Sequence, residues 1–139
     1  MPTAPRKAQQ VAKSAAPRRF VFLLLDRFTM LSFASAIEPL RIANRISGET
    51  LYTWRLTGDG GDTVTCSNGA SFKLDMGLDE VERDDTVLVC GGIDVRKATS
   101  KNVLNWLRRE ARRGVTMGGL CTGAYAVAKA GLLDGKKAT

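Results

Sequence analysis

The sequence predicts a three-layer α/β domain built on a mostly parallel β-sheet. Three observations lead to this fold. Short continuous apolar runs recur along the chain, and such runs are typical of strands buried on both faces of a parallel sheet. Segments of helical period separate these runs. Two short strand-like segments also flank a Ser-Asn-Gly turn, which indicates one inserted β-hairpin.

The first half of the folded region is expected to hold two strands, one helix and the hairpin. The run Phe-Val-Phe-Leu-Leu-Leu suits a buried strand, and the segment after it has apolar residues at helical spacing up to Gly48. Pro39 lies inside that segment and marks either a kink or the first turn of its main part. The expected elements are a strand at 20–25, a helix at 30–46, a strand at 51–57, hairpin strands at 63–66 and 70–74, and a loop with a short helix at 75–83.

The second half alternates strand and helix twice. Thr99 or Ser100 can cap the first of these helices, because either side chain can accept a hydrogen bond from the first helical turn, and Gly114 ends it. The expected elements are a strand at 86–90, a helix from 99 or 100 to 113, a short strand at 115–117 and a helix from 123 to 130. Ligands of such sheets bind beyond the carboxyl ends of the strands. Three loops, at 26–32, 91–94 and 119–122, are expected to meet there.

The start of the chain differs in composition from the rest. The first nineteen residues hold five of the 21 Lys and Arg residues and no acid, so the net charge of +7 falls to +2 for the remaining 120 residues. We expect residues 1–18 to be a disordered basic arm, because they lack apolar residues at any core period. The alternative is that the arm contacts phosphates, but a folded body so close to neutrality is weak evidence for nucleic-acid binding.

The cysteine and histidine counts narrow the possible chemistry. Cys66, Cys90 and Cys121 are an odd number with no close-spaced pair, which argues against a disulfide framework and against zinc. The chain has no histidine, so it lacks the commonest general base and metal ligand. We expect no metal and no cofactor. Because the sequence has neither a membrane-length apolar run nor a secretory apolar region at its start, the expected location is the cytoplasm.

The most informative motif is Gly-Leu-Cys-Thr-Gly at 119–123, between a predicted strand and a predicted helix. It has the pattern glycine-x-nucleophile-x-glycine, with Cys121 in the nucleophile position. The glycines permit a tight, strained turn that places the middle side chain in a cleft, where a thiolate gains from the helix dipole. The alternative is a small buried cysteine in a glycine-rich turn. The strand before the motif and the helix after it favour the strained elbow.

Other residues could complete a site around this elbow. Gly91 and Gly92 follow the preceding strand, and their backbone N–H groups are expected to be open to an anion or a carbonyl oxygen, although a plain turn explains them equally well. Asp26 or Glu38 could orient the thiol, and the alternatives are a loop acid and a helix-face acid. A catalytic cysteine needs a base nearby, and without histidine the chain lacks a Cys–His dyad.

Four segments follow one another in a recognisable order: 20–25, 31–44 (LSFASAIEPLRIAN), 87–92 (VLVCGG) and 118–123 (GGLCTG). In this order they resemble the PfpI-like superfamily, and more closely the amidotransferase-like N-terminal domains of GlxA-type regulators in the AraC family. The resemblance covers residues 19–139 and implies a flavodoxin-like three-layer sandwich. In that family two helix-turn-helix units follow this domain, and nothing in this chain resembles them. We therefore expect a sensor domain cut short at its C-terminal side, with the DNA-binding domain absent.

The resemblance also implies two departures from the enzymes of the superfamily. These enzymes place an acid at the start of the first helix, beside the nucleophile, and the matching residue here is Ser32. They commonly carry a histidine downstream of the cysteine, and this chain has none. Cys121 therefore occupies the nucleophile position without the partners of a catalyst, and we expect no enzymatic activity.

The expected function is effector sensing for an AraC-type transcription regulator, with a small metabolite bound in a cleft at the elbow. The resemblance implies small polar nitrogen-containing effectors, DNA contact only through the missing domain, no membrane partner and a homodimer. The alternative is a Cys-dependent PfpI-like hydrolase or hydratase, and a stand-alone interaction domain is a third possibility. The residues expected to line the cleft are Ser32, Gly91, Gly92, Ile93, Cys121 and Thr122.

Overall fold

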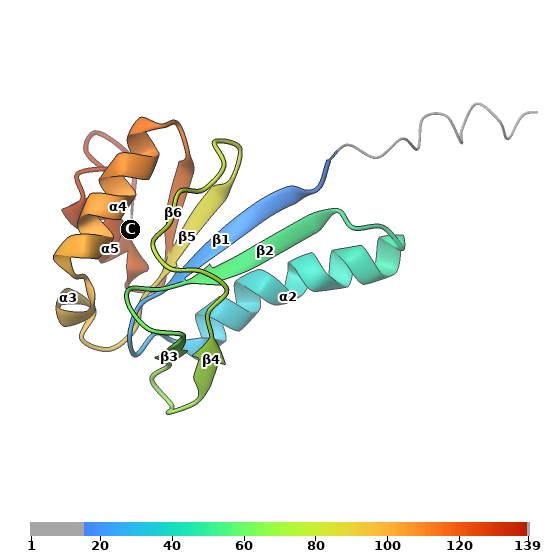
Figure 1. The fold of residues 1–139 in the computed structure, drawn as a ribbon, viewed down its shortest axis with the longest axis horizontal. Coiled ribbons are helices and arrows are strands. Elements are labelled where there is room, and N and C mark those ends of the chain that lie inside the picture. The colour runs from blue at the N-terminus through green and yellow to red at the C-terminus, as the bar shows by residue number, and fades with distance from the viewer. Residues whose placement is uncertain (1–15, 139) are drawn as a thin grey trace, which may run out of the picture.

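A computed structural model describes residues 16–138 of the chain (Figure 1). Its strands are β1 (Arg18–Leu24), β2 (Tyr52–Thr57), β3 (Thr63–Thr65), β4 (Ser71–Lys73), β5 (Thr86–Cys90) and β6 (Thr116–Leu120). Four of them form a sheet in the order β2-β1-β5-β6, and each neighbouring pair is parallel. β3 and β4 form a separate antiparallel pair, which is the predicted hairpin. The predicted parallel sheet with an inserted hairpin is therefore confirmed.

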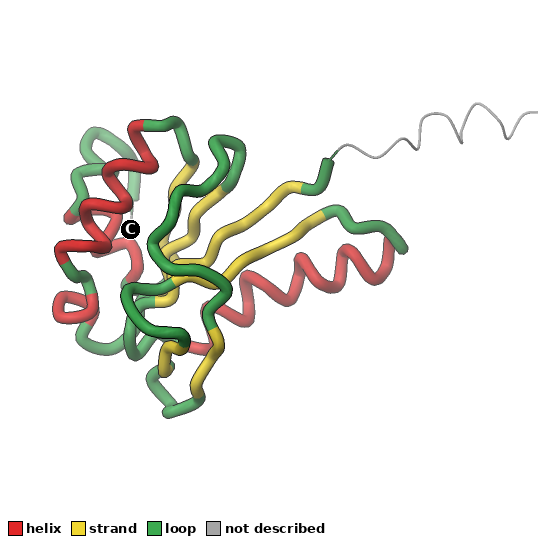
Figure 2. The backbone as a smooth tube through the Cα atoms, in the orientation of Figure 1, coloured by secondary structure: helices red, strands yellow, loops and turns green. Residues whose placement is uncertain are grey.

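Helices cover both faces of the sheet, as Figure 2 shows. The helices are α2 (Met30–Ser47), α3 (Val95–Ala98), α4 (Lys101–Arg112) and α5 (Gly123–Lys129). α2 packs on one face, and α4 and α5 pack on the other. The three-layer arrangement predicted from the sequence is confirmed. None of the helices in the described part of the chain is long and apolar enough to span a membrane.

The central strand β1 divides its side chains between two hydrophobic cores. Val21 and Leu23 join the core that α4 and α5 cover, whereas Phe22 and Leu24 join the core beneath α2. All four side chains are buried, because successive residues of a strand point to opposite faces and both faces are covered here. Burial of both faces of β1 thus explains the continuous apolar run in the sequence.

Helix α4 begins at one of the two N-cap residues predicted from the sequence. Of the two predicted caps, Ser100 is used, and its hydroxyl accepts a hydrogen bond of 3.1 Å from the backbone N–H of Val103. The helix buries Val103, Trp106 and Leu107 against the sheet. Its N-terminal end follows the short helix α3, which the sequence did not indicate.

The short helix predicted within 75–83 is wrong, because this segment contains no helix. It instead lies along α4, where the indole N–H of Trp106 donates to the carbonyl oxygen of Asp79 at 2.8 Å. The backbone N–H of Val81 donates to the buried carboxylate of Glu110, also at 2.8 Å. These partners are 27 and 29 residues away in sequence, so local pattern could not reveal them.

Several boundaries also differ from the prediction, most by one residue. β1 begins at Arg18, so the last residue of the predicted arm belongs to the sheet, and residues 1–15 of that arm lie outside the described residues. β6 extends to Leu120, beyond the predicted end at Met117. α2 continues through Pro39 as one helix up to Ser47, and Gly48 follows it with a left-handed φ of 71°. The longer β6 brings the sheet directly up to Cys121.

Candidate functional site

Cys121 lies on a sharp turn between the end of β6 and the start of α5. Its φ of 54° is in the left-handed region, which residues other than glycine seldom adopt. The residue is exposed, so the thiol is open to solvent. The predicted strained elbow is confirmed, and the alternative of a buried cysteine in a turn is wrong for Cys121.

The glycines of the motif let the elbow pack tightly against the sheet. A Cβ atom on Gly123 would lie 1.9 Å from the carbonyl oxygen of Val89 in β5. A Cβ atom on Gly119 would lie 2.5 Å from the backbone nitrogen of Ala124 in α5. Both contacts are far too short for any side chain, so only glycine at these two positions permits this approach of strand and helix.

The side chain that meets the Cys121 thiol is Thr29, from the loop between β1 and α2. The Thr29 Oγ1 and Cys121 Sγ atoms are 3.7 Å apart, and either can donate the hydrogen bond. Ser32, which we expected beside the thiol, donates its hydroxyl to the backbone oxygen of Thr29 at 3.0 Å instead. Ser32 thus closes the first turn of α2, and the hydroxyl that contacts the thiol is that of Thr29, which precedes this turn.

Gly91 and Gly92 connect β5 to this site in different ways. The N–H of Gly91 donates to the carbonyl oxygen of Leu120 at 3.3 Å, so the expectation that it is open to a ligand is wrong. The carbonyl oxygen of Gly92 accepts a bond of 2.8 Å from the hydroxyl of Thr122. The N–H of Gly92 forms no hydrogen bond within residues 16–138. One of the two predicted backbone donors thus remains.

Neither candidate acid orients the thiol. Glu38 forms an ion pair with Arg41 on the exposed side of α2, and Asp26 lines a separate cavity. The other two thiols are buried, and burial raises the pKa of the Cys90 thiol to about 12. Within residues 16–138, no group of three or more Cys, Asp or Glu side chains is placed to hold a metal ion.

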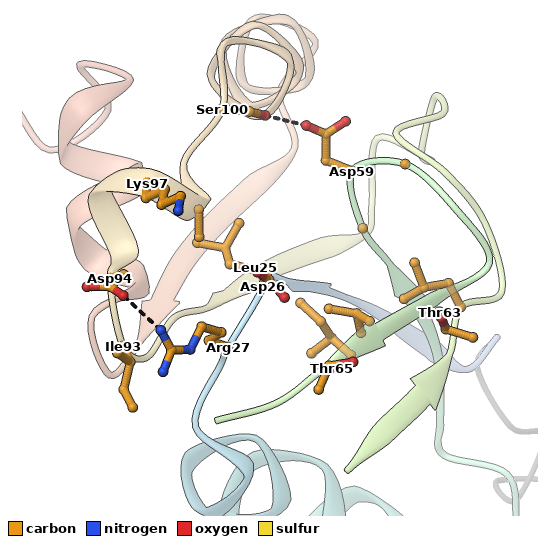
Figure 3. A pocket seen from close by; sticks show the side chains of 16 residues that line it. Leu25, Asp26, Arg27, Asp59, Thr63, Thr65, Ile93, Asp94, Lys97 and Ser100 are labelled. Atoms are coloured by element: carbon orange, nitrogen blue, oxygen red, sulfur yellow. Dashed lines mark hydrogen bonds and ion pairs between the residues drawn. The ribbon is translucent and has the colours of Figure 1, made fainter. Parts of the chain in front are cut away.

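The separate cavity has a volume of about 510 Å³ and opens beyond the carboxyl ends of β1 and β2 (Figure 3). Of the six predicted ligand-binding residues, Ile93 alone belongs to its lining. Gly92, Cys121 and Thr122 instead gather at the elbow with Thr29. The predicted set is therefore split between two places. The loops at 26–32 and 91–94, which were expected to meet beyond the strand ends, both line the cavity, whereas the residues after β2 and those of the hairpin were not expected there.

Comparison with known proteins finds one matching family and several similar proteins. A model described as the DJ-1/PfpI family matches residues 18–139. The HTH-type transcriptional regulator GbdR of Pseudomonas aeruginosa is 44% identical over 119 residues, which cover 86% of this chain and 32% of that protein. The HTH-type transcriptional regulator GlxA of Rhizobium meliloti is 41% identical over 123 residues, which cover 88% of this chain and 38% of that protein. This chain thus spans about a third of the length of these two regulators.

Solved structures with a similar fold include a transcription regulator and a ThiJ/PfpI family protein. The crystal structure of an AraC family transcriptional regulator from Pseudomonas putida has a TM-score of 0.72 and 28% identity, covering 86% of this chain and 64% of that chain. A ThiJ/PfpI family protein from Pseudomonas syringae has a TM-score of 0.70 at 18% identity, covering 97% of this chain and 54% of that chain. The second likeness concerns the fold alone.

Proposed function

Because this chain belongs to the DJ-1/PfpI family, we propose that it is the effector-sensing domain of an AraC-type transcription regulator. The support comes from its similarity to regulators rather than from the fold, which unrelated functions share. The sensor begins at Arg18, the first residue of β1, and the basic segment before it forms an arm. DNA is contacted through a further domain. Two-fold symmetry of such a regulator would pair two sensors, so we also propose a homodimer.

A small metabolite binds at the elbow in this proposal. The observation that carries it is the contact of the exposed Cys121 thiol with the hydroxyl of Thr29, where an enzyme needs a base. A threonine hydroxyl can donate or accept a hydrogen bond, but it does not take up a proton at neutral pH. The free N–H of Gly92 and the side chain of Thr122 offer further polar contacts. This set suits recognition of a polar ligand.

The second candidate is a Cys-dependent hydrolase or hydratase. The observation that favours it is the backbone strain at Cys121, because strained elbows present nucleophiles in many hydrolases. Turnover would require a base, which the 139 residues do not supply as histidine. The two candidates therefore differ in whether a bound compound is converted.

A survey of small metabolites by thermal unfolding of the chain tests the proposal. An effector should raise the Tm, because binding to the folded state stabilises it. Cys121→Leu, which fills the elbow, should abolish that rise. Ala128→Leu introduces the same side chain at an exposed position later on α5 and should leave the rise intact. A rise that survives Cys121→Leu would contradict binding at the elbow.

The genomic reading frame around this sequence tests the regulatory part. We expect it to encode a pair of helix-turn-helix units after the sensor, as in an AraC-type regulator. A reading frame that encodes an enzyme or no further domain there would contradict that part of the proposal. Ligand binding at the elbow would be unaffected by this result, so the two parts fail separately.

A further inference from the structure

The cavity is lined in part by the loops after β1 and β5, the two neighbouring strands between which the strand order of the sheet reverses. From β1 the chain passes through α2 on one face to β2, while β5 and β6 lie on the other side of β1 and are connected through α4 on the opposite face. In open α/β sheets, ligands bind outside the strand ends at such a switch point. The position of the cavity in the fold is therefore that of a binding site.

Two strained residues form the rim of this cavity. Arg27 has a φ of 61° and Asp94 a φ of 52°, and with Cys121 they are the non-glycine residues of positive φ in the described part of the chain. Their side chains form an ion pair of 2.9 Å, drawn in Figure 3. Such strain persists only where surrounding structure enforces it, and it clusters at functional sites.

Hydrogen bonds from two neighbouring loops enforce this conformation. The N–H of Arg27 donates to the carbonyl oxygen of Thr65 in the hairpin at 2.8 Å. The carbonyl oxygen of Arg27 accepts from the N–H of Ile93 at 3.2 Å. The rim thus joins the β1–α2 loop, the hairpin and the β5–α3 loop, so its shape is held before any ligand arrives.

The charges around the cavity do not balance. Its lining contains three carboxylates and two cationic side chains, and Arg27 neutralises Asp94. Asp59 is hydrogen-bonded to the hydroxyl of Ser100, whereas Asp26 has no ion-pair partner within residues 16–138. The remaining cation, Lys97, stands on the one-turn helix α3 and is exposed, so its long side chain can swing into solvent. The short Asp26 side chain cannot leave in this way.

The rest of the lining is apolar or small and contains no aromatic side chain. Quaternary ammonium ligands are recognised by aromatic cages, so this cavity is unsuited to them. A carboxylate instead recognises a cation that carries N–H donors. The apolar part of the lining consists of Leu24, Leu25, Val64, Leu74, Ile93 and Ala98.

We propose that this cavity is a second binding site, distinct from the elbow, for a small molecule with an ammonium or guanidinium group that donates to Asp26. The aliphatic part of the ligand lies on the apolar lining. The β5–α3 loop connects the site to the elbow, because Ile93 borders the cavity while its neighbour Gly92 is bonded to Thr122. The two sites are therefore neighbours in the fold, with Gly92 at the elbow and Ile93 at the cavity.

An NMR titration of the 15N-labelled chain with four probes of equal aliphatic length tests this proposal. The probes are butylammonium, butylguanidinium, butyltrimethylammonium and pentanoate. The first two should shift the amide signals of Arg27, Ile93 and Ser100, and the last two should leave them unchanged. Shifts that gather at Gly92, Cys121 and Thr122 instead, or equal binding of the trimethylammonium probe, would overturn the assignment.

Two substitutions in the lining should change the affinity in opposite directions. Asp26→Asn should weaken binding of butylguanidinium about tenfold, because it removes a charge-assisted hydrogen bond. Lys97→Gln removes a like charge and should tighten binding about threefold. Asp84→Asn is the control, because Asp84 is an exposed acid just before β5. It lies at the amino ends of the strands, whereas the cavity lies beyond their carboxyl ends. The amide spectrum of each variant shows that it is folded.

Each other outcome counts against the assignment. Weaker binding of butylguanidinium in Lys97→Gln would mean that the Lys97 charge does not repel the bound cation, which contradicts its placement beside Asp26 in this cavity. An equal loss in Asp84→Asn would mean that the probes respond only to net charge. These results do not depend on whether a metabolite binds at the elbow, because Cys121→Leu should leave the titration unchanged.

Discussion

The hydroxyl of Thr29 lies 3.7 Å from the thiol of Cys121, although the two residues are 92 positions apart in the sequence. The contact brings the loop after β1 to the elbow after β6. It gives the thiol a hydrogen-bonding partner that can hold it but does not deprotonate it at neutral pH. The chemistry proposed for this domain, binding without turnover, depends on that pair.

Cys121 should be the first of the three thiols to react with an alkylating reagent. It is exposed, whereas Cys66 and Cys90 are buried and Cys66 also donates to the side-chain oxygen of Asn68 at 2.8 Å. Limited treatment of the folded chain with iodoacetamide, followed by peptide mass mapping, measures the order. Modification of Cys66 or Cys90 ahead of Cys121 would contradict the exposed elbow.

Gly123→Ala should destabilise the fold strongly. Its Cβ would lie 1.9 Å from the Val89 carbonyl oxygen, so strand and helix must separate, at a cost of about 3 kcal/mol in the free energy of unfolding. Gly77→Ala is a matched control, because its Cβ would meet only the Asp79 carboxylate at 3.9 Å. Urea unfolding compares the two, and equal stability would show that the elbow is not packed as described.

Cys90 should make the fold less stable in alkaline solution. Its pKa is raised from 9.0 to about 12 by burial, so the thiol ionises in the unfolded chain first. This contribution to stability is fully present below pH 9 and is lost as the pH rises toward 12. At pH 10 the loss should be about 1.4 kcal/mol, the value of one pKa unit.

Cys90→Ala isolates this effect from other groups that titrate in the same range. Its unfolding free energy should fall less between pH 8 and pH 10 than that of the native chain, whatever its stability at pH 8. Identical pH dependence of the two proteins would refute the assignment to Cys90.

Two carboxylates that share Arg113 should differ widely in their contribution to stability. Glu110 is fully buried, pairs with Arg113 at 2.7 Å and accepts the N–H of Val81, so Glu110→Ala should cost about 3–5 kcal/mol. Glu80 pairs with the same arginine at 2.9 Å but is largely exposed, so Glu80→Ala should cost below about 1 kcal/mol. Chemical denaturation measures both, and similar losses would contradict the role of Glu110 in holding the 75–83 segment.

Most of the fold could be predicted from the sequence because its signals are local. The apolar run of β1, the Ser100 cap of α4 and the glycines around Cys121 each specify structure within a few residues. The segment at 75–83 could not be predicted, since its conformation depends on Trp106 and Glu110 in a later helix. The one-turn helix α3 is too short to leave a periodic pattern.

The site was predicted in part for the same reason. The elbow and its strain follow from one motif, so Cys121 and Thr122 could be found. Choosing Thr29 rather than Ser32 requires knowing which residue precedes the first turn of α2, and helix boundaries are the least certain feature of a sequence prediction. The loops at 26–32 and 91–94 were expected to meet, but the residues after β2 and those of the hairpin, which complete the cavity, carry no motif and come together only in the folded chain.

The most direct test of the central claim is the amount of product released from an activated ester by the chain. With p-nitrophenyl acetate in excess, the exposed Cys121 thiol should be acylated once, and without a base it should not turn over. We therefore predict that the native chain releases at most one equivalent of nitrophenol per chain more than Cys121→Ala does, which removes the contribution of the lysine amines. Many equivalents released by the native chain beyond those released by Cys121→Ala would contradict the account and identify a hydrolase instead.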